Sequence, residues 1–146
     1  MIYQFTIKTT PKNKTPSLND LIKAERTIFR KNGKIVSQGS LMKKKWQSYI
    51  CTFIIKDLGR QKIEKPFVVD FDIYEPDRKR DIGNVFAPLE KFTMDALQDT
   101  QTIPNDNQRW YKGFSAHFHI DRENPRIVVT ITEIEGNEND TKSNHT

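Results

Sequence analysis

Four charged residues in the second half of the sequence have types and a spacing that suit metal-dependent cleavage of a phosphodiester. Asp81 lies where a strand-like pattern ends and a helical pattern begins. Lys91 and Asp95 are four residues apart on the helical segment, so they share one face. Asp106 lies in the loop that follows. Such cleavage uses carboxylates that hold Mg²⁺ and cations that stabilise charge on the phosphate.

Each of these residues also fits an ordinary structural role. Asp81 could interact with the positive end of a helix dipole. Lys91 and Asp95 could form a surface ion pair worth a few tenths of a kcal/mol. Asp106, in the run Asn-Asp-Asn, could belong to a simple turn. Spacing alone leaves both interpretations open.

A second carboxylate pair, Asp70 and Asp72, shares one face of a predicted strand. The pair could hold a metal ion, and a solvent-facing strand surface is the simpler interpretation. The three histidines do not form a zinc set, because His117 and His119 have no third ligand near them and His145 is in the tail. No glycine-rich phosphate loop or nucleophile elbow is present.

Positive charge is concentrated in the first third of the chain. The 146 residues carry a net charge of +5, with 24 Lys and Arg against 19 Asp and Glu. Within residues 8–45 there are eleven Lys and Arg against Asp20 and Glu25, a net of +9, which leaves −4 for the rest. This asymmetry favours an arm that binds a polyanion beside a carboxylate site. A solvated basic surface is the alternative.

The single cysteine, Cys51, excludes an intramolecular disulfide and is compatible with a reducing, cytoplasmic location. We expect no signal peptide, because the first ten residues alternate rather than form an apolar block. We also expect no membrane contact, because no stretch reaches about 18 apolar residues.

Hydrophobic periodicity predicts strands and helices along most of the chain. Period-two alternation predicts strands in 1–11, 66–75, 110–121 and 127–134. Helical spacing predicts a helix that Ser17 caps and Asn32-Gly33 ends, and a second over 41–58 that Gly59 closes.

A third helix is expected from about Val85 to Gln98, with Pro88 in its first turn. The element order predicts an α+β fold, in which helices pack on one face of a mixed sheet of about four strands. We expect a single domain over residues 1–135 and a disordered polar tail over 136–146.

Three segments resemble the RusA-type Holliday junction resolvases, the crossover junction endodeoxyribonucleases of phages and prophages. They are "EPDRKRDIGN" (75–84), "KFTMDAL" (91–97) and "TIPNDNQ" (102–108). The resemblance covers roughly residues 66–132. "TPSLNDLIKAER" and "MKKKWQSYI" also resemble the longer form of this family, found in phages of low-GC Gram-positive hosts.

The resemblance implies a RusA-like fold and a cytoplasmic homodimer that cuts four-way DNA junctions symmetrically in phage recombination or repair. The cofactor would be Mg²⁺, with Mn²⁺ as a substitute. Asp81 and Asp106 would hold the metal, with Asp95 or Asp72 as further ligands, and Lys91 would stabilise the phosphate charge. The shape of a junction is recognised through its phosphates. The expected DNA contacts are Arg30, Lys31, Lys43, Lys44, Lys45, Arg78, Lys79 and Arg80.

Gly83 departs from the family pattern Asp-x-Asp-Asn, because glycine has no side-chain ligand. One possibility is that a nearby carboxylate replaces the missing one. Another is that the protein binds junctions and cuts them weakly or not at all. A third possibility is that the chain is a phage accessory protein that binds a protein partner through its acidic half.

Overall fold

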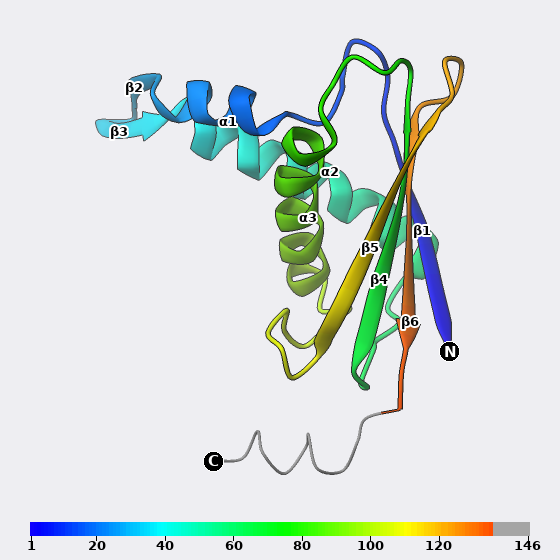
Figure 1. The fold of residues 1–146 in the computed structure, drawn as a ribbon. Helices are drawn as coiled ribbons and strands as arrows, with labels where there is room; N and C mark the ends of the chain where they lie inside the picture. Colours follow the sequence, from blue (N-terminus) through cyan, green and yellow to red (C-terminus); the bar gives the residue numbers. More distant parts are fainter. Residues whose placement is uncertain (136–146) are drawn as a thin grey trace.

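A four-stranded sheet organises residues 1–135, the part of the chain that this computed structural model describes (Figure 1). Its strands are β1 (Ile2–Lys8), β4 (Phe67–Glu75), β5 (Tyr111–Ile120) and β6 (Arg126–Glu133), in the order β1-β6-β4-β5. β6 is antiparallel to both neighbours, whereas β4 and β5 are parallel. The predicted α+β fold with a mixed sheet is confirmed. The predicted tail, 136–146, lies outside the described residues.

The two faces of the sheet differ because apolar residues alternate along its strands. On β4, Phe67, Val69, Phe71 and Ile73 are buried, and the residues between them are half-buried. Phe71 pairs with Val129, which also pairs with Phe5, so the buried row continues across three strands. Such a row is expected of a sheet with one face against a core.

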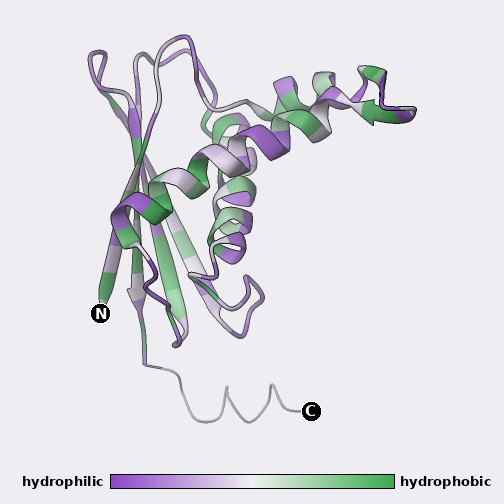
Figure 2. Cartoon of the chain, turned by 180° about the vertical axis from the view of Figure 1, so that it is seen from behind, coloured by the Kyte–Doolittle hydropathy of each residue, from purple (hydrophilic) through white to green (hydrophobic). Residues whose placement is uncertain are grey.

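Two long helices cover the apolar face. α2 (Gln38–Leu58) crosses the sheet, as Figure 2 shows, and α3 (Ile82–Asp99) connects the parallel strands β4 and β5. Their buried side chains recur at steps of three or four residues, as a helix that packs on one side requires. In α2 these side chains are Trp46, Ile50, Ile54 and Leu58. No helix in the described part is long and apolar enough to cross a membrane.

Two of the predicted helix boundaries are confirmed. α1 (Leu18–Glu25) begins with the predicted capping box, in which Ser17 and Asp20 each accept a hydrogen bond from the other's backbone N–H. α2 ends at Gly59, whose φ of 60° lies in the left-handed region that glycine tolerates.

The prediction that Asn32-Gly33 ends a helix was wrong. α1 ends at Glu25, and the next residues form an antiparallel hairpin of β2 (Ile28–Lys31) and β3 (Lys34–Ser37). Asn32 and Gly33 have φ values of 53° and 78°, as in the two-residue turns that suit hairpins. β-branched and aromatic residues on both sides of an Asn-Gly pair were the signal for this hairpin.

α3 begins at Ile82, three residues before the predicted start at Val85. Pro88 therefore lies in the second turn rather than the first, so that prediction was also wrong. Proline lacks the N–H that would bond to the carbonyl of Asn84, and this favours a bend in the helix at that point.

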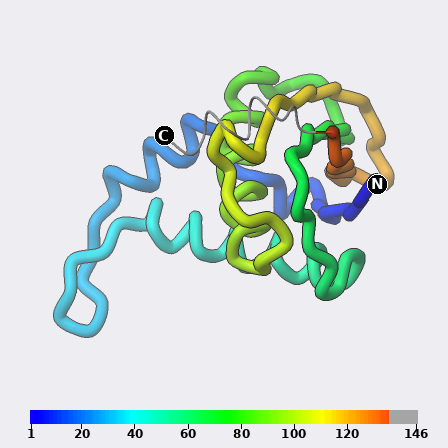
Figure 3. The backbone as a smooth tube through the Cα atoms, turned by 90° about the horizontal axis from the view of Figure 1, so that it is seen from below, coloured from blue at the N-terminus to red at the C-terminus, as the bar shows by residue number. Residues whose placement is uncertain are grey.

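The hairpin and the first turns of α2 project from the body of the molecule (Figures 1 and 3). We call residues 26–45 the arm. Gly39, the second residue of α2, is buried against Glu25 at the end of α1. A Cβ at Gly39 would lie 3.0 Å from the Cα of Glu25 and closer still to its side chain. Close packing therefore fixes the arm on α1.

We expect Gly39→Ala to lower the free energy of unfolding by about 1–2 kcal/mol, because the added methyl must displace backbone atoms of α1. Gly83→Ala is the matched control, since Gly83 is the second residue of α3 and nothing lies within 4 Å of an added Cβ. Alanine should stabilise that helix by up to about 1 kcal/mol. Equal effects of the two variants in urea denaturation would contradict this account of the arm.

Candidate functional site

Asp81 is the N-cap residue of α3, and its side chain makes no capping hydrogen bond. The Asp81 carbonyl accepts from the Val85 N–H at 3.1 Å, while the exposed carboxylate is left available. Gly83 follows in the first turn, also exposed, with open space where a side chain would stand. The backbone therefore tolerates an aspartate at position 83.

Lys91 lies in the middle of α3, far from Asp81. Ten residues of helix separate them, which at 1.5 Å per residue is about 15 Å along the axis. The Lys91 ammonium is 3.2 Å from Asp95, in the ion pair that their spacing predicts. The lysine is 67% exposed, so this pair contributes little to stability and leaves the ammonium accessible.

Asp106 lies near enough for its charge to act on a carboxylate that was not among the predicted site residues, Glu90. Burial raises the pKa of Glu90 above its ordinary value of 4.5, the negative charge of Asp106 raises it further, and Lys91 opposes the rise. Both acids are half-buried. We call Glu90 and Asp106 the acid pair.

Tyr111, at the start of β5, lies within range of the charges of the acid pair. Burial raises the pKa of its hydroxyl, and the charges of Glu90 and Asp106 raise it further. The hydroxyl oxygen is buried and has no hydrogen-bond partner among the described residues. A protonated hydroxyl is thus held within range of the charges of two carboxylates, without a hydrogen bond to either.

A sequence signal for Glu90 exists. Glu90 is four residues after Phe86, whose ring packs on Phe71 of β4 and Phe114 of β5, with centroids 5.1 and 5.3 Å away. Residues four apart lie on one helix face, so Glu90 is an acid on the side of α3 that meets the sheet. A carboxylate within an apolar stripe is a candidate site residue.

We expect Glu90→Gln to stabilise the protein at neutral pH. Because the folded-state pKa of Glu90 is raised, its ionised form opposes folding, and this cost is absent below about pH 4.5 and grows as the pH rises. The melting temperature of the variant should exceed that of the wild type by about 2 °C at pH 7 and match it at pH 4. Glu123→Gln, in an exposed turn, should change neither value. A lower melting temperature at pH 7 would contradict the strain assigned to the acid pair.

Asp70 and Asp72 lie on the other face of the sheet, away from α3. Asp70 accepts a hydrogen bond from Ser115, and Asp72 is 2.9 Å from Nε2 of His119. The sheet therefore separates Asp72 from the acid pair. Among the described residues, no group of three or more His, Cys, Asp or Glu is arranged to hold a metal ion.

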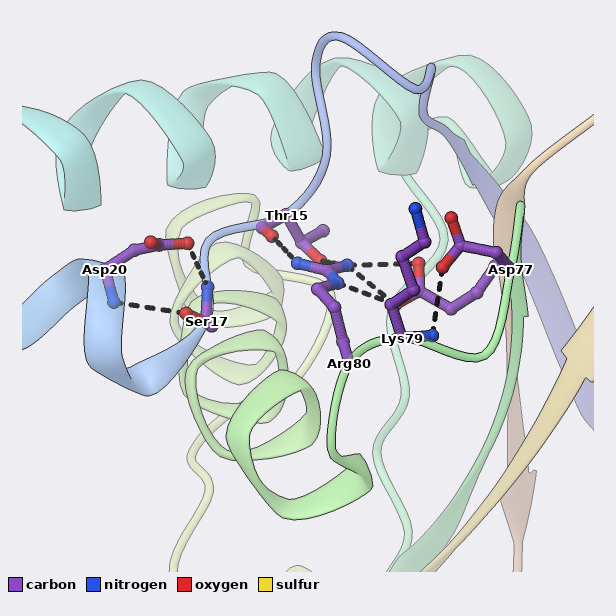
Figure 4. A network of polar contacts seen from close by, with 7 residues as sticks. Thr15, Ser17, Asp20, Asp77, Lys79 and Arg80 are labelled. Atoms are coloured by element: carbon purple, nitrogen blue, oxygen red, sulfur yellow. Dashed lines mark hydrogen bonds and ion pairs between the residues drawn. The ribbon is translucent and has the colours of Figure 1, made fainter.

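The basic loop before α3 divides into a buried and an exposed part. Arg80 donates to both carboxylate oxygens of Glu75, at 2.8 and 3.0 Å, and to the Thr15 carbonyl at 2.5 Å (Figure 4). The Lys79 backbone N–H donates to Asp77 and holds the pKa of that carboxyl below its usual range. Arg78 and Lys79 are exposed. Arg80 therefore joins β4 to the segment before α1, and its neighbours carry the free charge.

A half-open hollow of about 640 Å³ lies beside this loop, at the carboxyl ends of the parallel strands β4 and β5. Arg78, Arg80, Ile82 and His119 are among its lining residues. Clefts at this end of parallel strands commonly bind ligands. Asp81 lies between two of the lining residues and thus at the edge of the hollow.

The remaining predicted DNA contacts lie on the arm. Lys43 is 2.7 Å from Glu25, whereas Arg30, Lys31, Lys44 and Lys45 are exposed and form no ion pair among the described residues.

No family model and no curated protein matches this chain.

Proposed function

We propose that this protein is a Mg²⁺-dependent endonuclease that cuts four-way DNA junctions, as its resemblance to the RusA-type resolvases implies. The observation that carries the proposal is the acid pair, two half-buried carboxylates on α3 and the following loop, with Lys91 beside them. Two acids kept close at a cost in stability are typical of a site selected for function.

The acid pair fits Mg²⁺ by its donor chemistry. Mg²⁺ prefers oxygen ligands and is usually bound by one or two carboxylates, with water and substrate phosphate completing the shell. A cation would also relieve the repulsion that raises the pKa of Glu90. Glu90 and Asp106 would hold the ion. The bound ion would act as a Lewis acid and stabilise the negative charge on the scissile phosphate.

Basic residues act on the substrate directly. The exposed Lys91 ammonium stabilises negative charge on the phosphate. Arg78 and Lys79, with the arm, bind the flanking backbone through phosphate contacts that carry no sequence information. Binding is therefore expected to weaken steeply as salt rises.

A homodimer is part of the proposal, because two symmetric cuts require two sites. β5 is an edge strand of ten residues, and no described strand pairs with its outer side. It carries Phe114, which is 57% exposed. A long open edge with an apolar side chain suits pairing with a second copy. Light scattering of the wild type and of Phe114→Lys tests this, with a monomeric variant as the supporting result.

A junction-binding protein that cuts weakly or not at all is the second candidate. The observation that favours it is the distance of about 13.5 Å along α3 between Asp81 and Glu90, nine residues apart. Gly83 adds no carboxylate near Asp81. Losing one carboxylate that binds the metal can lower the cleavage rate by orders of magnitude, because a tenfold change in rate corresponds to only about 1.4 kcal/mol of transition-state stabilisation.

Two measurements on a synthetic four-way junction test both candidates. A cleavage assay with and without Mg²⁺ or Mn²⁺ measures cutting, and a gel shift measures binding. Paired symmetric nicks that disappear with chelator and in Asp106→Asn would establish the endonuclease. Tight junction binding without nicks, with cutting gained in Gly83→Asp, would establish the binder. Position 83 has room for that side chain. Equal binding of junction and duplex would contradict both.

A further inference from the structure

The arm is basic throughout. Residues 26–45 contain seven basic residues and no Asp or Glu; the basic residues are Arg26, Arg30, Lys31, Lys34, Lys43, Lys44 and Lys45. All seven are exposed. Only Lys43 forms an ion pair within the described part of the chain, with Glu25. A projecting element with this charge is complementary to a polyanion.

The hairpin at the end of the arm has one inner and one outer face. Strand pairing puts Phe29 and Val36 opposite each other, and both are half-buried. Phe29 lines a shallow groove together with Met42 and Trp46 of α2. The inner face of the hairpin is therefore turned toward α2.

The outer face presents two isoleucines to solvent. Arg30 is paired with Ile35, and Ile28 is two residues before Arg30, so all three lie on this face. Ile28 is 64% and Ile35 70% exposed. Diagonal neighbours across a strand pair are about 7–8 Å apart, so the two side chains form one small apolar surface beside an arginine. Figure 2 shows hydrophobic residues at this end of the arm among hydrophilic ones.

We propose that the β2–β3 hairpin is a wedge that packs Ile28 and Ile35 against base pairs exposed at a DNA branch point. Proteins that open or kink DNA insert apolar side chains between base steps while arginines and lysines hold the phosphates. The hairpin has both parts, with Lys31 and Lys34 at its tip. A two-stranded ribbon is also narrow enough for a DNA groove.

The inference rests on the proposed DNA binding but not on cleavage. Branched DNA exposes base-pair faces that uniform duplex keeps stacked. The isoleucines therefore contribute to selectivity for the junction, and the basic residues contribute to both kinds of DNA. The acid pair is not involved.

The test uses the full chain and a four-way junction with 2-aminopurine at the branch point, whose fluorescence rises when the base unstacks. Ile28→Ser/Ile35→Ser should lose this rise and bind the junction about tenfold more weakly, with duplex affinity unchanged. The control, Ile2→Ser/Ile55→Ser, removes isoleucines that are 66% and 58% exposed elsewhere and should behave as the wild type. Arg30→Gln/Lys31→Gln/Lys34→Gln should weaken both complexes and lower their salt dependence.

Unchanged fluorescence and affinity in the isoleucine variant would overturn the wedge and leave the proposed function standing. Absence of selective junction binding by the wild type would remove the proposed function and the wedge together. Sedimentation with anionic lipid vesicles that depends on Ile28 and Ile35, without an effect on DNA, would assign the surface to a membrane and overturn the wedge. Because both side chains are exposed, the variants should keep the wild-type melting temperature.

Discussion

Arg80→Met is expected to lower the free energy of unfolding by about 3 kcal/mol. The guanidinium of Arg80 and the carboxylate of Glu75 are only 19% and 12% exposed, and they are joined at 2.8 Å. The same guanidinium donates to the Thr15 carbonyl. Methionine would leave a nearly buried carboxylate without a counter-charge and a carbonyl without its donor, which costs far more than breaking a surface pair.

Urea denaturation of Arg80→Met measures this loss, and Arg78→Met is the matched control. Arg78 is exposed on the same loop and forms no ion pair among the described residues, so its replacement should change stability by less than about 0.5 kcal/mol. Glu75→Gln in the Arg80→Met background should recover part of the loss, because it removes the unpaired charge. If Arg80→Met were as stable as Arg78→Met, the pair with Glu75 would not hold the loop.

Asp106→Asn is expected to reduce junction cleavage at least about 100-fold, equivalent to about 2.7 kcal/mol of transition-state stabilisation. Asparagine keeps the size of the side chain but removes the charge with which Asp106 would bind Mg²⁺. Stability should change in the opposite direction, since the charge of Asp106 raises the pKa of Glu90. The variant should therefore melt above the wild type at pH 7, as is also expected of Glu90→Gln.

Single-turnover cleavage and melting curves with and without Mg²⁺ test the role of Asp106 independently. Mg²⁺ should raise the melting temperature of the wild type and have no effect on Asp106→Asn or Glu90→Gln. Glu123→Gln controls for the loss of one negative charge. Junction affinity in a gel shift should stay unchanged in all three variants. A normal cleavage rate in Asp106→Asn would remove the acid pair from the reaction.

Local patterns in the sequence were sufficient for the main elements. Alternation over 66–75 predicted β4 and its buried face, and the three- and four-residue steps over 41–58 predicted α2. These predictions succeeded because the spacing of apolar residues within a short stretch shows which side of a strand or helix faces the core. The capping box at Ser17 and the stop at Gly59 are equally local.

The hairpin at 28–37 and the start of α3 were mispredicted because local signals competed. Asn32-Gly33 suits both the end of a helix and a hairpin turn, and the strands beside it are only four residues long. Pro88 favours the first turn of a helix, yet α3 starts earlier and accepts the proline in its second turn. Packing on the sheet, through Phe86 and Phe71, decided the start of α3, whereas pairing between β2 and β3 decided the hairpin.

The sequence by itself determined the element types, the core faces, the concentration of positive charge on the arm and the ion pair of Lys91 with Asp95. Only the tertiary structure decided which charges meet. It joined Arg80 to Glu75 and Thr15, set Glu90 beside Asp106, and separated Asp72 from both by the thickness of the sheet. The reason is physical: Thr15 and Arg80, like Glu90 and Asp106, belong to different segments of the chain that the fold brings near each other, and such pairings leave no periodic trace in a local stretch of sequence.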